Sequence, residues 1–263
     1  MTVIAVFVAL AAMMAAPSPY EGVTEPIRQV VIGSTVAGRV KEIRSEEGRR
    51  VRKGGVIMVL EKDEEELNVS IAKLEAEDSS EILSARQKRQ TYERDYAATK
   101  KLFETSNSVS EEQLWEKELN FKTADADLQK ALAVKAKQKL EYQMSKVQLE
   151  KRMLRAPFDG IVVKHHKHIA ESVQALEPLV DFVDVRHCRF VSYVLAPLAQ
   201  RFRKGQVVTL QLDGASAPRL RKGRVSFVAP VVDKSSLLRA VKIVFDNANG
   251  SIEPGVTGRI LVK

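Results

Sequence analysis

The most regular pattern along the chain lies in its middle. Between Glu64 and Arg152 the sequence has neither proline nor glycine and is rich in Glu, Lys, Ala, Gln and Leu, residues that favour helix. The interruption TSNSVS ends with Ser110, three residues before Gln113, which is the spacing of a capping box at the start of a second helix. Residues 64–151 are therefore predicted to form two antiparallel helices of about 40 residues each, a hairpin about 60 Å long.

Apolar residues on both predicted helices recur at the spacing of a two-stranded coiled coil. The predicted contact stripe of the first helix is Leu67, Ile71, Leu74, Ala85, Tyr92, Tyr96 and Phe103. That of the second helix is Leu114, Phe121, Leu128, Tyr142 and Leu149, interrupted by Lys135. Charged residues fill the other faces, so we predict a solvated rod. From residue 64 to 152 there are 16 Lys plus Arg and 18 Asp plus Glu, which argues against a grip on nucleic acid.

Short valine-rich segments flank the predicted hairpin. From 28 to 63, apolar residues at Val36, Val40 and Ile43 and the turn sequences EEGRR and RKGG predict brief strands. Similar text resumes over 152–186 with RAPFDGIVV and looks like the continuation of the first segment. Residues 187–263 contain the apolar runs FVSYVL, VVTLQL, GRVSFVA, AVKIVF and TGRILV, which predict a small antiparallel barrel or sandwich. The fold class is therefore α+β with several domains.

The N-terminus and the single cysteine bear on location. Residues 3–16 form an uninterrupted apolar run, too short to span a bilayer but of the length found in secretory signals. We predict an export signal over 1–20, with a buried strand or a mis-assigned start as alternatives. No cysteine follows the run, which excludes a lipid-anchored lipoprotein. Cys188 is the only cysteine; its neighbours His187 and Arg189 could lower its pKa, but a partly buried, unreactive residue is the favoured interpretation.

Three of the four histidines lie in the sequence KHHKH, and imidazole is a common ligand of zinc and copper. On a continuing strand, His166 and His168 would share one face. Two ligands do not complete a site, and Asp159 and Glu171 are candidates only by proximity. A solvent-facing hairpin is the favoured interpretation, so no metal site is predicted, with His166 and His168 as the weak candidates. Neither G-x-S-x-G nor a P-loop is present, and no enzyme, catalytic residue or cofactor is predicted.

The order of these parts resembles that of the membrane fusion proteins, or periplasmic adaptors of the HlyD type. The matching text is VAGRV from Val36, EEGRRVRKG from Glu46, LRAPFDGIV from Leu154 and NANGSIEPGVTGRILV from Asn247. The resemblance runs from about Val30 to the end of the chain. It implies a lipoyl-like domain in two halves (28–63 and 152–186), a helical hairpin (64–151) and a β-barrel domain (187–263). Because the chain stops soon after the barrel motif, a short form without a membrane-proximal domain is expected.

The resemblance also implies a function. Such proteins are adaptors in tripartite efflux or secretion systems, located in the periplasm of Gram-negative-type bacteria and associated with the inner membrane. The implied partners are an inner-membrane transporter, an outer-membrane channel and further copies of the chain in a ring that is usually hexameric; no nucleic acid is implied. The alternative is a cytosolic or envelope coiled-coil scaffold with β interaction modules and no transport role. Lys62 lies at the base of a predicted helix and not at a tight hairpin tip, which argues against a lipoyl or biotinyl carrier.

In the resistance-type members of the family, the hairpin tip docks on the outer-membrane duct through the pattern R-x-x-x-L-x-x-x-x-x-x-S. Aligned on Ser110, the pattern puts Phe103 at the leucine position and Thr99 at the arginine position, so the arginine is missing and the adjacent Lys100 and Lys101 are candidate substitutes. The predicted tip contacts are Thr99, Lys100, Leu102, Phe103, Val109 and Ser110. For the apolar members of this set, packing of the two helices at the turn is the alternative.

Overall fold

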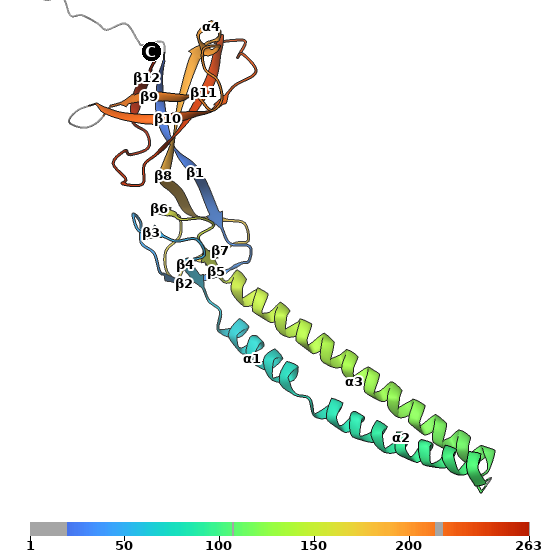
Figure 1. The fold of residues 1–263 in the computed structure, drawn as a ribbon. Coiled ribbons are helices and arrows are strands. Elements are labelled where there is room, and N and C mark those ends of the chain that lie inside the picture. The colour runs from blue at the N-terminus through green and yellow to red at the C-terminus, as the bar shows by residue number, and fades with distance from the viewer. Residues whose placement is uncertain (1–19, 107, 214–217, 263) are drawn as a thin grey trace, which may run out of the picture.

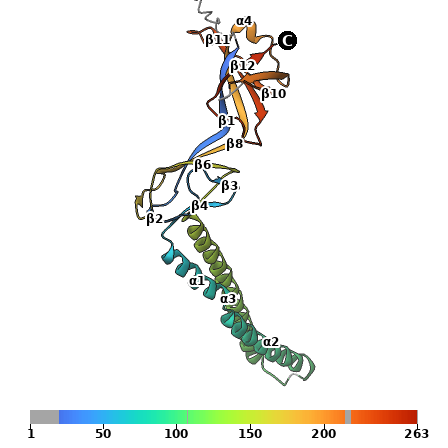
Figure 2. The same cartoon turned by 90° about the vertical axis from the view of Figure 1, so that its left-hand side faces the viewer.

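The computed structural model describes residues 20–106, 108–213 and 218–262. Apart from Tyr20, the predicted export signal at 1–20 lies outside these residues. A β-barrel, a smaller β module and a helical hairpin follow one another along an elongated molecule, and the same order is visible in both views (Figures 1 and 2). The predicted α+β fold is therefore confirmed. No described helix is both long and apolar enough to cross a membrane.

Three helices form the hairpin: α1 (Asp63–Glu77), α2 (Ser80–Ser106) and α3 (Glu111–Lys151). The hydroxyl of Ser110 accepts a hydrogen bond from the Gln113 amide at 3.2 Å, and Gln113 Oε1 accepts one from the Ser110 amide at 3.2 Å. This reciprocal pair satisfies two amides at the start of α3 that have no partner within the helix. The predicted capping box is confirmed.

The first arm of the hairpin is broken, whereas the sequence predicted one continuous helix. The chain leaves helical geometry at Asp78, where φ is −61° and ψ is 122°. Oδ1 of Asp78 accepts a hydrogen bond from the Ser80 amide at 2.9 Å, at the start of α2. From the opposite arm, the buried Lys135 donates to the Asp78 carbonyl oxygen. The Ser80 amide and the Asp78 carbonyl at the break therefore both have hydrogen-bond partners. Lys135, which interrupts the apolar stripe of α3, lies opposite the break.

Beyond the break, α2 and α3 pack as the predicted stripes require. Tyr96 and Phe121 stack with ring centroids 6.0 Å apart, and the Arg89 guanidinium lies 5.3 Å from the centre of the Phe121 ring. Arg89 also forms an ion pair with Asp125 across the two arms at 2.5 Å. Alternating aromatic and ionic contacts thus hold the outer part of the rod together.

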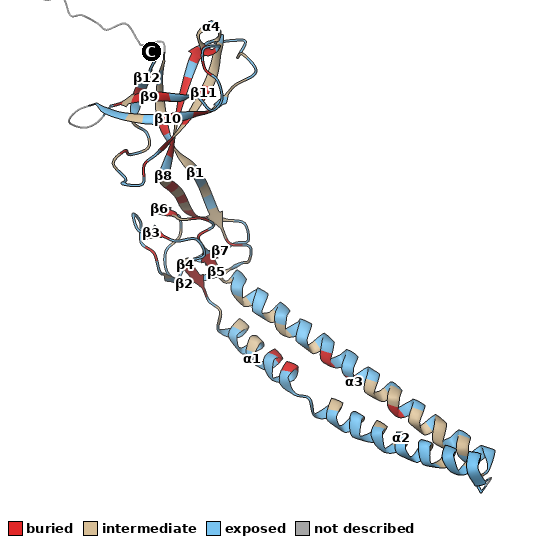
Figure 3. Ribbon diagram, viewed as in Figure 1, coloured by how far each residue is buried: buried red, intermediate tan, exposed pale blue. Residues whose placement is uncertain are grey.

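The predicted stripe of α1 is wrong. Ala72 and Ala76 are buried against α3, whereas Leu67, Ile71 and Leu74 are 65%, 55% and 70% exposed. The alanines carry short side chains and allow α1 to lie close to α3, so the helix turns its alanine face inward and its leucine face outward. Figure 3 shows the buried positions of α1 on the side facing α3. This difference leaves an apolar row on the outer edge of the hairpin.

The β module holds the base of the hairpin. Its strands are β2 (Gly38–Ile43), β3 (Arg50–Val51), β4 (Val56–Leu60), β5 (Met153–Arg155), β6 (Gly160–His165) and β7 (Ser172–Val173). Backbone hydrogen bonds join its two halves: Gly54 N donates to Ala156 O at 2.8 Å, and Gly48 N donates to Val162 O at 2.8 Å. Arg152 donates to Glu65 and, at 2.8 Å, to the Ala37 carbonyl. The module and both arms are therefore joined at one point.

The RAPFDG sequence closes the module. Phe158 is buried and packs against Phe182 with ring centroids 5.3 Å apart. Oδ1 of Asp159 accepts a hydrogen bond from the Lys53 amide at 2.7 Å, and this donor, together with the nearby positive charge of Arg186, lowers the pKa of Asp159. The loop that follows the hairpin in sequence is thereby bound to the RKGG turn that precedes the hairpin.

Strands β1 (Glu21–Gly33), β8 (Pro178–Leu195), β9 (Val207–Leu212), β10 (Arg219–Val228), β11 (Leu238–Asp246) and β12 (Thr257–Leu261), with the short helix α4 (Ala196–Ala199), form the barrel. Within the described residues the pairing order is β1-β12-β9-β10-β11-β8, and β8 pairs back to β1, which closes the ring. All five runs predicted in 187–263 lie in strands of this barrel, and the sixth strand is β1, from before the module. Strands β1 and β8 pair along their length and continue from the barrel into the module. The predicted boundary at 186/187 therefore falls inside strand β8.

Candidate functional site

The tip of the hairpin is the part of the described chain that lies farthest from the β-barrel (Figure 1). Helix α2 ends at Ser106, α3 begins at Glu111, and Asn107 lies outside the described residues. Side-chain hydrogen bonds tie the turn to itself: Ser108 Oγ donates to Ser106 Oγ at 2.7 Å, and the Ser110 hydroxyl caps α3. The last turn of α2 and the first turn of α3 are therefore held as one unit.

The predicted tip contacts differ in what they present to a partner. Leu102 is 50% exposed, and Lys100 is exposed with its ammonium 4.0 Å from Glu104. Phe103 and Thr99 are partly buried, in the same spacing as the contact stripe of α2, and the Thr99 hydroxyl donates to the Asp95 carbonyl at 2.8 Å. Thr99 thus uses its donor within its own helix. Val109 is partly buried in the turn.

Two exposed apolar residues near the tip were not predicted from the sequence. Trp115 is 70% exposed and Leu119 is 65% exposed, one turn apart on α3. With Glu112, Glu116, Glu118 and Lys122 they line a shallow surface hollow of about 700 Å³. The signal was present in the sequence: Leu114 occupies the contact stripe, so the next residue, the only tryptophan of the chain, must project elsewhere. A large exposed aromatic at the end of a rod is typical of a contact surface.

His165, His166 and His168 lie at the exposed end of strand β6. Strand β6 ends at His165, whose Nε2 is 2.8 Å from the Ser45 carbonyl oxygen. His166 Nε2 lies 3.0 Å from Asp181 Oδ1, and His168 Nδ1 lies 3.6 Å from Glu171. Because the strand ends before them, His166 and His168 do not share a strand face, and each has its own carboxylate. Among the described residues no three His, Cys, Asp or Glu side chains gather as a metal site would require.

Cys188 is buried in the barrel core and fully covered. Burial raises the pKa of its thiol to about 11, although Asn247 Nδ2 lies 3.6 Å from the sulfur and opposes this effect. The alternative that neighbouring cations lower the pKa is therefore wrong. We expect a maleimide to leave the native protein unlabelled at pH 8 and to label it fully in denaturant, as measured by intact mass. Rapid labelling of the native chain would contradict this burial.

The CzcB-like, barrel-sandwich hybrid domain model matches residues 28–184, more than half of the chain. The chain belongs to this family. Membership confirms the predicted resemblance to membrane fusion proteins. The cobalt-zinc-cadmium resistance protein CzcB of Cupriavidus metallidurans is 26% identical over 232 residues, covering 84% of this chain and 40% of that protein. The chain therefore spans less than half the length of this relative.

Solved structures of other proteins share the fold of this chain. MacA from Actinobacillus actinomycetemcomitans superposes with a TM-score of 0.76 at 16% identity, covering 92% of this chain and 76% of that one. The membrane fusion protein Spr0693 from Streptococcus pneumoniae R6 gives a TM-score of 0.60 at 15% identity, covering 92% of this chain and 97% of that one. At this level of identity the similarity concerns the fold alone.

Proposed function

We propose that this chain is a periplasmic adaptor of an efflux or secretion system, bridging an inner-membrane transporter and an outer-membrane channel. The observation that carries the proposal is the shape of the described chain, in a family of membrane fusion proteins: one narrow rod ends in a self-tied tip, and two β domains share the long strands β1 and β8 at its other end. Such a molecule acts by spanning a distance and holding partners at its two ends.

In this proposal the hairpin tip contacts the channel. Leu102 on α2 and the pair Trp115 and Leu119 on α3 offer exposed apolar area, and Lys100 offers a cation next to Thr99, which stands at the position of the missing arginine. Interfaces of this kind draw their affinity from a few desolvated apolar anchors surrounded by polar residues. Phe103, Val109 and Ser110 shape the turn that presents these residues. The β-barrel and module then face the transporter, and several copies form a ring, hexameric by analogy with the family.

The decisive experiment is an exposed charge at the tip. Leu102→Asp is expected to abolish export by cells in which this chain is the sole adaptor, because an apolar contact is replaced by a carboxylate that must be desolvated on docking. The melting temperature should stay within about 2 °C of wild type, since substitutions at exposed positions change stability little. Export of the system's substrate and co-purification of the channel are measured.

The matched control is Leu83→Asp, the same substitution at a leucine of the same helix that is 57% exposed but distant from the tip. It should export normally. Phe103→Asp is a less direct test, because Phe103 is partly buried in the spacing of the contact stripe and its substitution changes stability and docking together. Normal export and normal channel recovery with Leu102→Asp would refute the assignment of the tip.

A further inference from the structure

The first arm of the hairpin is broken between α1 and α2 (Figure 1), and a surface hollow of about 710 Å³ lies where this break faces α3. Small-molecule sites have volumes of about 300–1,000 Å³, so the size of the hollow suits a small ligand. We call it the break hollow. The residues that line it are Ser79, Ser80, Ile82, Leu83, Arg86, Leu132, Lys135, Ala136 and Lys139.

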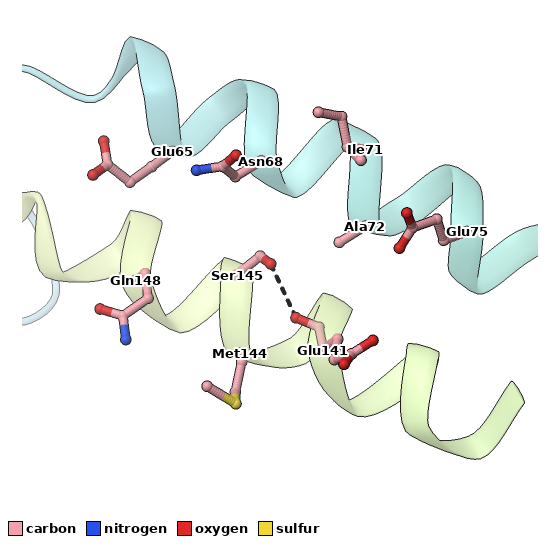
Figure 4. A pocket seen from close by; sticks show the side chains of 9 residues that line it. All are labelled: Glu65, Asn68, Ile71, Ala72, Glu75, Glu141, Met144, Ser145 and Gln148. Atoms are coloured by element: carbon pink, nitrogen blue, oxygen red, sulfur yellow. Dashed lines mark hydrogen bonds between the residues drawn. The ribbon is translucent and has the colours of Figure 1, made fainter. Parts of the chain in front are cut away.

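The charged residues of the break hollow are all basic. Arg86, Lys135 and Lys139 line it, and none of the lining residues is acidic. Two other hollows of the hairpin have the opposite character. The hollow at the base is lined by three glutamates and no cation (Figure 4), and the hollow near the tip by three glutamates and one lysine. Because the hairpin as a whole is slightly acidic, this gathering of cations is a local feature of the break.

The cations of the break hollow have few partners of their own. Within the described chain, neither Arg86 nor Lys139 lies within ion-pair distance of a carboxylate. Lys135 is 9% exposed, and the Asp78 carbonyl is the one acceptor that the described residues give to its three N–H donors. The pKa of the Asp78 carboxyl is lowered mainly by hydrogen bonds from Ser80 and less by the charge of Lys135. An anion in the hollow would therefore find unused donors.

Apolar side chains form the middle of the break hollow. Lys88 pairs with Asp127 across the arms at 2.8 Å, and five residues closer to the base on each arm lie Leu83 and Leu132. The two leucines are thus at the same level, one on each side of the hollow. They are 57% and 39% exposed, so neither covers the other. The hollow therefore combines an apolar floor with a basic rim.

We propose that the break hollow binds a small anionic amphiphile, a molecule with a carboxylate or phosphate head and a hydrocarbon chain. The head accepts hydrogen bonds from Lys135 and pairs with Arg86 and Lys139, because charge-assisted hydrogen bonds are the strong ones. The chain covers Leu83 and Leu132, which removes apolar surface from water. An uncharged amphiphile would desolvate the cations without pairing them, and a cationic one would be repelled. The site lies away from the tip and does not depend on the proposed adaptor function.

Isothermal titration calorimetry of the full chain with decanoate tests the site. The wild type is expected to bind decanoate at one saturable site. In Arg86→Gln/Lys139→Gln the dissociation constant should rise by about tenfold or more, because both exposed cations of the hollow lose their charge. Lys135 is left unchanged because it satisfies the Asp78 carbonyl. The melting temperature of the variant should stay within about 2 °C of wild type, as for other exposed substitutions.

The matched control is Arg94→Gln/Lys130→Gln, which makes the same substitutions on α2 and α3 outside the hollow. It should bind decanoate as the wild type does. Decyl maltoside, which has the same chain length and no charge, should bind at least about tenfold more weakly than decanoate. Decanoate that associates with the apolar run at residues 3–16 does so equally in every variant and cancels in the comparison.

Several results would overturn the assignment of an anionic ligand. These are equal binding by the wild type and Arg86→Gln/Lys139→Gln, an equal loss in the control, and equally tight binding of decyl maltoside. Decyl phosphate as a second titrant distinguishes a phosphate head from a carboxylate head, and the site is refuted if neither binds. If decanoate does not bind but self-association of Arg86→Gln/Lys139→Gln falls in sedimentation, the cations instead serve an acidic segment of a second copy.

The export variants separate this inference from the proposed function. Leu83→Asp puts a carboxylate into the break hollow and should weaken decanoate binding by about tenfold or more while export stays normal. Leu102→Asp lies outside the hollow and should bind decanoate normally while export is lost. A chain that exports normally but never binds decanoate would keep the adaptor function and refute the anion site.

Discussion

The variant Gly160→Val is expected to destabilise the β module strongly. A Cβ atom at position 160 would lie 2.4 Å from the Val183 carbonyl oxygen and 2.7 Å from the Phe182 ring. Neither neighbour can move, because Val183 belongs to the β6–β8 pairing and Phe182 is fully buried in the module core. Overpacking commonly costs about 1–3 kcal/mol, and a clash with backbone lies at or above the upper end. The midpoint of denaturant unfolding measures the loss.

The matched control is Val163→Ala on the same strand, where the side chain is 49% exposed. Its unfolding free energy should change by less than about 0.5 kcal/mol, as at most surface positions. A Gly160→Val variant with wild-type stability would show that β6 and β8 leave room for a side chain at position 160, so that close strand packing does not require the glycine of RAPFDG.

Local rules predicted the parts of this fold that local residues determine. The absence of proline and glycine, the capping box at Ser110 and the repeated tyrosines and phenylalanines of α2 and α3 predicted a hairpin and its turn. The turns with Gly48 and Gly54, both with positive φ, were readable from EEGRR and RKGG. By contrast, the closing strand β1 comes from a distant part of the chain, and no local pattern indicates that it joins a barrel.

The inner face of α1 could not be read from hydrophobicity. Leucine and isoleucine outrank alanine as candidates for a core stripe, yet Ala72 and Ala76 face α3 and Leu67 faces outward. Leu67, Ile71 and Leu74 have helical spacing whether that side of α1 faces α3 or solvent. Periodicity therefore identified an apolar stripe but not whether it packs against α3. The signal that could have helped is the pair Lys135 and Asp78, which fixes how α1 sits against α3.

In the candidate site, too, some features could be predicted from local sequence and others depend on distant parts of the chain. The turn located the tip, but the exposed Trp115 matches no position of the family pattern and was therefore not predicted as a contact. His166 and His168 were considered as ligands because of their spacing on a supposed strand, but β6 ends at His165, before both of them, so they do not share a strand face. Where a strand ends depends on its pairing partner, in this case β8, which a local pattern does not include.

The second large effect is expected from Asn247→Asp in the barrel. Asn247 is buried, and its Nδ2 donates to the carbonyl oxygens of Val185 at 3.0 Å and Ile252 at 2.8 Å, while its Oδ1 accepts from the Ile252 amide at 2.9 Å. An aspartate keeps the acceptor but loses both donors, so two carbonyls face a carboxylate. With about 1–3 kcal/mol for each of the two buried carbonyl groups left unpaired, we expect a loss of roughly 2–6 kcal/mol at pH 7.

The loss should depend on pH in a defined direction. A neutral acid can donate one hydrogen bond to a carbonyl and the anion none, so the folded state raises the pKa of the introduced carboxyl above the unfolded value of about 3.9. The penalty is therefore smallest below about pH 4 and grows as pH rises through the raised folded pKa. Unfolding free energies at pH 4 and pH 7 measure the difference. Asn249→Asp is the control, because Asn249 uses only its oxygen, as acceptor from Ser251. Equal stability of the two variants at pH 7 would show that the hydrogen bonds of the Asn247 amide to Val185 and Ile252 do not stabilise the barrel.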